Sequence, residues 1–130
     1  MNAAAKIRPE QANRCRVLVV EDNIEGARLL ATLIRTMGHE VDYAINGYAA
    51  LKLAETFGPE VVIIDLALPD MTGWAVARAL REKPGGEKLR IYATTGRYGE
   101  EARQRSLAVG CDDHLLKPID PATIEKLLAS

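Results

Sequence analysis

The sequence predicts an α/β fold in which five parallel strands form a doubly wound sheet of the (βα)5 type. Two apolar runs, Val17–Val20 and Val61–Ile64, have the character of strands that are buried on both faces. Five strand-like segments alternate strictly with five helix-like segments along the chain. That alternation requires parallel strands joined by right-handed crossovers, with helices on both faces of the sheet. At 130 residues the chain has room for one such domain.

The first strand and helix follow an N-terminal stretch without a clear apolar face. Residues 1–15 are polar and alanine-rich, and we expect a disordered leader there, before a domain that spans 16–130. After the strand at 17–20, apolar residues recur at helical spacing and predict a helix that stops at Gly38 (Leu29, Leu30, Leu33, Ile34, Met37).

A half-exposed strand and a second helix come next. Apolar and less apolar residues alternate over 41–45, which is typical of an edge strand, and His39 in the preceding turn is expected to be exposed. Residues 50–57 carry an apolar helical face that the Gly-Pro pair at 58–59 ends. The buried strand at 61–64 then ends at a carboxylate, Asp65.

The remaining segments repeat the alternation of helix and strand. After a Pro/Asp/Gly loop, residues 76–82 predict a helix with charged residues on its solvent side (Arg78, Arg81, Glu82). A strand at 89–93 ends in two threonines, and the helix at 100–109 has so thin an apolar stripe that we expect it to be loosely held. The short strand at 114–116 leads to a last helix, which Asp120 caps and whose buried face is apolar (Ile124, Leu127, Leu128).

The strand order follows from the character of the individual strands. The first and third strands are apolar throughout, whereas the second has one solvent face. These properties favour the order 2-1-3-4-5, which is the flavodoxin-like order.

Composition excludes several classes of function. The net charge is −1 with acids and bases interspersed, so nucleic-acid binding and membrane binding are not expected. Without the apolar core of a signal peptide or a run long enough to span a bilayer, a cytoplasmic location is expected. Cys15 and Cys111 are far apart in sequence and lack the clustered ligands of a thiolate metal site, so both are expected to be reduced and without a metal.

Five polar residues should meet at the carboxyl edge of the predicted sheet. They directly follow or end the central strands (Glu21, Asp22, Asp65, Thr95, Lys117). Because the first and third strands are neighbours in the proposed order, three carboxylates crowd together and repel one another unless a cation joins them. A site with three acids and neither His nor Cys prefers a hard cation that binds oxygen, which predicts Mg²⁺.

The same edge offers a binding shape for a phosphoryl group. Mg²⁺, the Thr95 hydroxyl and the Lys117 ammonium together offset the charge of such a group. No Ser, Cys or His competes with Asp65 as the residue to which the group could be joined. Each residue alone also fits a simpler interpretation, such as a turn acid, a turn hydroxyl or a solvated charge. Their joint position favours the functional interpretation.

The chain resembles a response-regulator receiver domain of two-component signalling over about residues 16–129. The resemblance rests on four motifs: Val-Val-Glu-Asp-Asn at 19–23, Asp-Leu-Ala-Leu-Pro-Asp-Met-Thr-Gly at 65–73, Thr-Thr-Gly at 94–96 and Leu-Leu-Lys-Pro at 115–118. The segments at 94–101 and 111–120 are also similar to receivers attached to hybrid histidine kinases. A single-domain receiver and a piece of a hybrid kinase both remain open.

The resemblance implies a role for each residue at the edge. Asp65 would be the phosphoacceptor, Asp22 a direct Mg²⁺ ligand and Glu21 a ligand through water. The backbone carbonyl of Ala67 would be a further ligand, while Thr95 and Lys117 would contact the phosphoryl group. The Lys117-Pro118 bond is expected to be cis, as in the family. Such a domain accepts a phosphoryl group and assists its own phosphorylation and dephosphorylation, so it is not expected to be an enzyme in the ordinary sense.

Departures from the family pattern concern how the signal is passed on. Where receivers usually have an aromatic switch residue this chain has His114, which is either a surface residue or an imidazole that moves inward with Thr95. Two residues past Asp65 and Thr95 stand Ala67 and Arg97, at positions that tune dephosphorylation in the family. Since alanine cannot orient a water molecule, hydrolysis of the phosphoryl group is expected to be slow.

The expected partners are proteins. A histidine kinase or a histidine phosphotransfer protein would donate the phosphoryl group to an acceptor whose downstream target is unknown, and a homodimer through the fourth helix, fifth strand and fifth helix is one further option. A flavin- or nucleotide-binding module on the same architecture is the main alternative, although neither G-x-G-x-x-G nor a Walker sequence occurs. A receiver that acts only by docking, without phosphorylation, is the other alternative.

Overall fold

The computed structural model describes residues 14–97 and 99–129. Five parallel strands form one sheet in the order β2-β1-β3-β4-β5, so the predicted fold class and strand order are confirmed. The strands are β1 (Arg16–Val20), β2 (Glu40–Ala44), β3 (Val61–Asp65), β4 (Arg90–Thr95) and β5 (Asp113–Leu116). The predicted leader lies outside the described residues except for Arg14 and Cys15.

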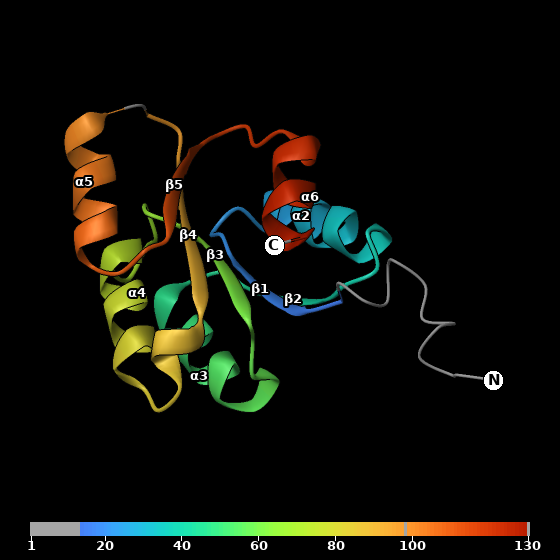
Figure 1. The fold of residues 1–130 in the computed structure, drawn as a ribbon, viewed down its shortest axis with the longest axis horizontal. Helices are drawn as coiled ribbons and strands as arrows, with labels where there is room; N and C mark the ends of the chain where they lie inside the picture. The colour runs from blue at the N-terminus through green and yellow to red at the C-terminus, as the bar shows by residue number, and fades with distance from the viewer. Residues whose placement is uncertain (1–13, 98, 130) are drawn as a thin grey trace.

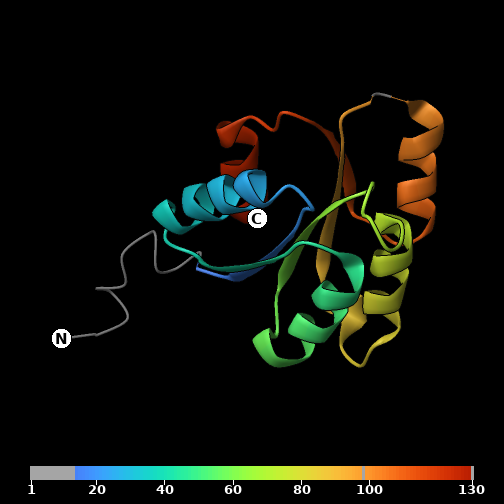
Figure 2. The same ribbon diagram turned by 180° about the vertical axis from the view of Figure 1, so that it is seen from behind.

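Helices cover both faces of the sheet (Figures 1 and 2). The elements are α2 (Ile24–Thr36), α3 (Gly47–Phe57), α4 (Gly73–Glu82), α5 (Glu100–Ala108), α6 (Pro121–Ala129) and a short 3-10 turn, η2 (Gly86–Lys88). In Figure 1, α2 and α6 lie on one side of the sheet, and α3, α4 and α5 lie on the other. No helix within the described ranges has the length and apolar character needed to cross a membrane.

The central strands divide their side chains between two cores. Alternate residues of β1 and β3 face the α2/α6 side, where they pack with Ile34 and Ile124 (Val17, Val19, Val61, Ile63). The intervening residues pack with Val76 and Leu80 of α4 (Leu18, Val20, Val62, Ile64). Each of these aliphatic side chains contributes about 1.5–3 kcal/mol by leaving water. The two cores together fix the strand ends that carry the polar residues.

Helix capping largely follows the local sequence. The side chains of Asn23, Asn46 and Thr72 accept hydrogen bonds from the first turns of α2, α3 and α4. The Asp120 carboxylate accepts from the Ala122 N–H, as the prediction of a cap required. In α5 the buried residue is Ser106, so the thin apolar stripe is confirmed.

Two apolar positions differ from the prediction. Leu29 was expected on the buried face of α2, but 73% of it is exposed, because the helix turns Ala27, Ala31 and Ile34 toward the sheet instead. Ile45 lies beyond the end of β2 and is also exposed.

The prediction that His39 is exposed is wrong. His39 is only 8% exposed, because its Nδ1 accepts a hydrogen bond from the Cys15 N–H at 3.1 Å. The Cys15 Sγ lies 3.4 Å from the same nitrogen. This contact joins the start of β1 to the turn before β2, at the amino edge of the sheet.

The prediction that Arg81 lies on the solvent side of its helix is also wrong. Its side chain is 19% exposed and reaches past the end of α4 to the amino edge of the sheet. The guanidinium group donates to the carbonyl oxygens of Gly86, Leu89 and Gly110 and to the Asp112 carboxylate, at 2.5–2.9 Å. Asp112 accepts in addition from the Ile91 N–H, so one ionic cluster joins α4, η2, β4 and the turn before β5.

Candidate functional site

The carboxyl edge of the sheet brings together the polar residues that the sequence singled out. Asp65 is the last residue of β3 and pairs in register with Thr94 of β4. Thr95 ends β4, and the N–H of Lys117 donates to the Thr95 carbonyl at 2.7 Å. Glu21 directly follows β1, the strand next to β3. The edge therefore gathers residues that are up to 96 positions apart in the chain.

Three carboxylates form an acidic cluster at this edge. Glu21, Asp22 and Asp65 each offer an oxygen atom, and these atoms lie within 4.8 Å of one another. The side chains of Glu21 and Asp65 are 15% and 10% exposed, whereas Asp22 is open to solvent. A set of oxygen ligands with one open side fits Mg²⁺, which keeps several of its waters when it binds to proteins.

Lys117 lies against two members of the acidic cluster. Its Nζ is 2.8 Å from Asp65 Oδ2 and 2.5 Å from Glu21 Oε1. Burial would lower the pKa of Lys117, but the hydrogen bonds and charges of Asp65 and Glu21 outweigh burial and raise it. The ammonium group therefore stays charged and offsets part of the repulsion among the carboxylates. The Lys117-Pro118 peptide bond is cis, as expected.

The loop between β3 and α4 holds the Asp65 side chain from the other side. The Ala67 N–H donates to Asp65 Oδ1 at 3.0 Å, and the Gly73 N–H returns to the Leu66 carbonyl at 2.9 Å. A Cβ at Gly73 would lie 2.5 Å from the carbonyl oxygen of Asp65, so only glycine allows the helix to begin this close to the strand end.

Asp70 anchors the same loop, and the sequence did not single it out. Its two carboxylate oxygens accept from the N–H groups of Gly47 and Tyr48, each at 2.8 Å, at the start of α3. The Tyr48 bond, followed by the Gly47 bond, lowers the pKa of Asp70. The Asp70-Met71 pair within the loop motif was visible in the sequence, but its partner helix lies more than twenty residues earlier.

The other predicted residues surround the cluster at different depths. Thr95 is half-buried, and its Oγ1 accepts from the Arg97 N–H at 3.3 Å. Ala67 and Arg97 are exposed beside the edge. His114 is half-buried in β5, with its Nδ1 at 2.9 Å from Ser106 Oγ of α5. The Ser106 contact depends on a helix that sequence patterns place only loosely, so it was not foreseen.

The fold and the edge together define a class of protein: a doubly wound α/β domain with an acidic site and a lysine at the carboxyl ends of its strands. A family model described as "Response regulator receiver domain" matches residues 17–129. The chain belongs to this family, the receiver domains of two-component systems. Receiver domains are generally non-enzymatic signalling domains that interact with histidine kinases or phosphotransfer proteins.

Individual relatives agree with the family. The chain is 37% identical over 112 residues to an uncharacterized 14.6 kDa protein of Leptolyngbya boryana, a match that covers 86% of each chain. It is 38% identical over 104 residues to the phosphate regulon transcriptional regulatory protein PhoB of Rhizobium meliloti, covering 79% of this chain and 45% of PhoB. The chain thus spans less than half the length of that regulator. The chemotaxis protein CheY4 of Vibrio cholerae has a similar structure, with a TM-score of 0.84 and 31% identity over 88% of this chain and 96% of CheY4.

Proposed function

We propose that this receiver accepts a phosphoryl group on Asp65 from a histidine kinase or a histidine phosphotransfer protein in the cytoplasm, and signals through a change in protein contacts. The observation that carries the proposal is the position of the Asp65 carboxylate within the acidic cluster: one oxygen is bonded to the Lys117 ammonium and the other to the Ala67 N–H. Both carboxylate oxygens of Asp65 are thereby oriented.

The transfer itself is a displacement at phosphorus. One Asp65 oxygen forms the new P–O bond while the P–N bond of the donor phosphohistidine breaks, and the donor imidazole leaves with the electron pair and takes up a proton. Lys117 can stabilise the negative charge of the transferred group, because its ammonium already lies 2.8 Å from an oxygen of the Asp65 acceptor. The Thr95 hydroxyl accepts from Arg97 and keeps its own proton for a phosphoryl oxygen.

A Mg²⁺ ion fits the residues at this edge. Asp22 and Asp65 would hold it directly, Glu21 through water, and the Ala67 carbonyl would complete the protein ligands. When bound, the ion neutralises charge on the carboxylates and on the transferred group. Glu21 is held ready by its bonds to Lys117 and to the Asn23 N–H, so its orientation does not depend on the ion.

A groove beside Lys117 suits the phosphoryl donor. It has a volume of about 610 Å³ and is lined mostly by apolar groups from α2 and from the loop before α6 (Leu29, Leu30, Leu33, Pro118, Ile119, Pro121). Leu29 is a large apolar side chain that is 73% exposed, and exposed apolar surface next to a reactive group is typical of a protein interface. The donor would cover this groove.

The decisive experiment is phosphorylation with phosphoramidate in the presence of Mg²⁺, read by intact mass. We expect one labile phosphoryl adduct on the wild-type chain and none on Asp65→Asn. Glu25→Gln is the matched control, because Glu25 is an exposed acid at the same end of α2 but outside the cluster. An adduct that persists in Asp65→Asn would refute the proposal, and bound flavin or nucleotide on purification would favour the alternative function.

A further inference from the structure

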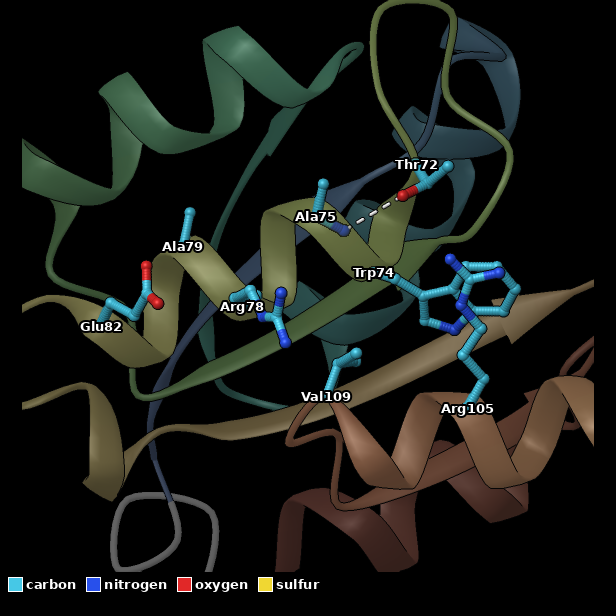
Figure 3. A pocket seen from close by; sticks show the side chains of 8 residues that line it. All are labelled: Thr72, Trp74, Ala75, Arg78, Ala79, Glu82, Arg105 and Val109. Carbon is cyan, nitrogen blue, oxygen red and sulfur yellow. Dashed lines mark hydrogen bonds between the residues drawn. The ribbon is translucent and has the colours of Figure 1, made fainter.

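A chain of two hydrogen bonds joins α4, α5 and β5. The Trp74 Nε1–H donates to Ser106 Oγ at 2.8 Å, and Ser106 Oγ lies 2.9 Å from His114 Nδ1. Ser106 is fully buried, and the Arg105 guanidinium next to it stacks on the Trp74 ring at 4.1 Å from the ring centre. Figure 3 shows Trp74 from α4 and Arg105 from α5 side by side. We call the Trp74–Ser106–His114 chain the catch.

The proton positions in the catch follow in part from its donors and acceptors. The Trp74 Nε1–H can only donate, so the Ser106 oxygen accepts from it. Ser106 Oγ and His114 Nδ1 share one further hydrogen bond, in which either group can donate, because the serine oxygen has two lone pairs. The other ring nitrogen, Nε2, is buried and has no hydrogen-bond partner within the described part of the chain. Burial, followed by the charge of Arg103, lowers the pKa of His114, which favours a neutral ring.

An imidazole in this state is held by one nitrogen only. A buried polar atom without a partner costs free energy, so an orientation that gives Nε2 a partner competes with the one found here. Ser106 supplies the bond that opposes this change. Because the ring is half-buried rather than locked in the core, a single hydrogen bond decides between two orientations.

Both ends of the catch lie on elements that lead directly to residues of the phosphorylation site. Trp74 follows Gly73, whose backbone packs directly on the Asp65 carbonyl. His114 lies three residues before Lys117 on the same strand and its following loop. A movement of either loop around Asp65 therefore pulls on one end of the chain of bonds, and α5 has little apolar packing to resist it.

We propose that Ser106 is a positioning residue that holds His114 in the orientation of the unphosphorylated protein, and that phosphorylation at Asp65 opens this catch. The inference rests on the proposed function. Its consequence reaches the surface, because Trp74 and Arg105 form one wall of a pocket of about 410 Å³ between α4 and α5 (Figure 3). Opening the catch frees the indole N–H and reshapes that wall.

The test compares the wild-type chain with Ser106→Ala by ¹⁵N NMR of labelled histidine and by the fluorescence of Trp74, the single tryptophan. In the unphosphorylated wild type, His114 should show a neutral ring with a hydrogen-bonded Nδ1. Phosphoramidate with Mg²⁺ should remove that bond and shift the Trp74 emission. Ser106→Ala should show the open state of both signals without phosphate. Its initial rate of phosphorylation should rise by about fivefold, the equilibrium factor that corresponds to one typical hydrogen bond.

Two further variants keep the test decisive. Gln104→Ala, on the exposed side of α5, should behave as wild type, and Trp74→Phe should weaken the His114 Nδ1 bond if Ser106→Ala fails to fold. Unchanged His114 signals in the variants, or an intact Nδ1 bond in the phosphorylated wild type, would overturn the catch. Failure of the proposed function gives a different result, because intact mass then shows no phosphoryl adduct on the wild-type chain. The role of Ser106 is still tested in that case: an unchanged His114 Nδ1 signal in unphosphorylated Ser106→Ala would overturn the catch.

Discussion

The two edges of the sheet each surround a cation with oxygen atoms, but they balance its charge in opposite ways. At the amino edge, Arg81 donates to three backbone carbonyls and shares one carboxylate, Asp112. At the carboxyl edge, Lys117 faces Asp65 and Glu21, and Asp22 stands beside them without an ion pair to any residue that the structure describes. At the amino edge, the charge of Arg81 is balanced by the single carboxylate of Asp112. At the carboxyl edge, three carboxylates face one lysine, so negative charge is in excess.

This difference separates a structural cluster from a functional one. A guanidinium group such as that of Arg81, whose N–H donors are already bonded to acceptors, joins neighbouring segments and would not be stabilised further by a ligand. Carboxylates in excess repel one another at short range and gain from any cation that enters. The fold can tolerate the second arrangement because the two cores behind it are apolar throughout. The comparison can be tested at either edge.

The largest effect is expected at the amino edge. Arg81→Ala removes the donor from the carbonyl groups of Gly86 and Leu89, at the two ends of η2, and of Gly110, in the turn before β5, although Gly86 keeps its bond from the Leu89 N–H. We expect a loss of about 3 kcal/mol in the free energy of unfolding, at about 1 kcal/mol for each of the three lost hydrogen bonds. Urea unfolding followed by circular dichroism measures it.

The matched control is Arg78→Ala, one turn earlier on the exposed side of the same helix. Its expected effect is within about 0.5 kcal/mol, as for an ordinary surface position. Equal losses in the two variants would mean that the Arg81 cluster contributes nothing beyond helix propensity, and the contrast between the edges would disappear.

A smaller effect of opposite sign is expected at the carboxyl edge. Asp22→Asn removes one of three mutually repelling carboxylates, so without Mg²⁺ the variant should be more stable than wild type by about 1 kcal/mol. Added Mg²⁺ should then stabilise the wild type by about 1.4 kcal/mol at ten times its dissociation constant, and should stabilise the variant much less.

Thermal or urea unfolding with Mg²⁺ or with a chelator tests both halves of this prediction. Asp42→Asn serves as a control, because Asp42 lies on β2 away from the cluster. A variant that is destabilised without Mg²⁺ would show that Asp22 is held by favourable contacts rather than by repulsion.

The same comparison explains which parts were predictable from the sequence. The meeting of Glu21, Asp22, Asp65, Thr95 and Lys117 at the carboxyl edge was predicted, because each of them ends or directly follows a short apolar strand and parallel strands end together, whereas Asp70 in the next loop was missed. The amino edge was not, because its contacts join turns that lack a shared local pattern. Helical periodicity assigns Arg81 to the solvent side from its Cα position, but a long side chain can reach around the helix end. His39 is buried by a residue 24 positions earlier, which no window of sequence contains.

His39 makes the amino edge sensitive to acid. Burial, followed by the charges of Arg90 and Arg14, lowers the pKa of His39 below its ordinary value of 6.5. The unfolded chain therefore binds a proton more readily than the native state. Stability from this group is complete above about pH 6.5 and is lost as the pH falls from there through the lowered native pKa.

Urea unfolding across this pH range should show the loss in the wild type and a flatter profile in His39→Gln. The half-buried His114 contributes a similar slope through its own lowered pKa, so the variant flattens the profile only in part. A variant with the wild-type slope would mean that protonated His39 is tolerated at the amino edge.

The smallest effect on stability is expected at Ala67, where a substitution should change only the rate at which the phosphoryl group is hydrolysed. This exposed residue lies beside Asp65 but cannot orient a water molecule toward a phosphoryl group, whereas an asparagine amide can. Ala67→Asn should leave the free energy of unfolding within about 0.5 kcal/mol of wild type. It should shorten the lifetime of the phosphoryl group by about fivefold, which corresponds to about 1 kcal/mol in the barrier.

The decay of the adduct by intact mass, after removal of the donor, measures this lifetime, and Arg97→Ala tests the facing position in the same way. Equal decay in Ala67→Asn and wild type would mean that access of water is set elsewhere, with Arg97 as the remaining candidate. Shorter lifetime at unchanged stability would show that the carboxyl edge can be tuned without disturbing the fold, which the tightly paired amino edge does not allow.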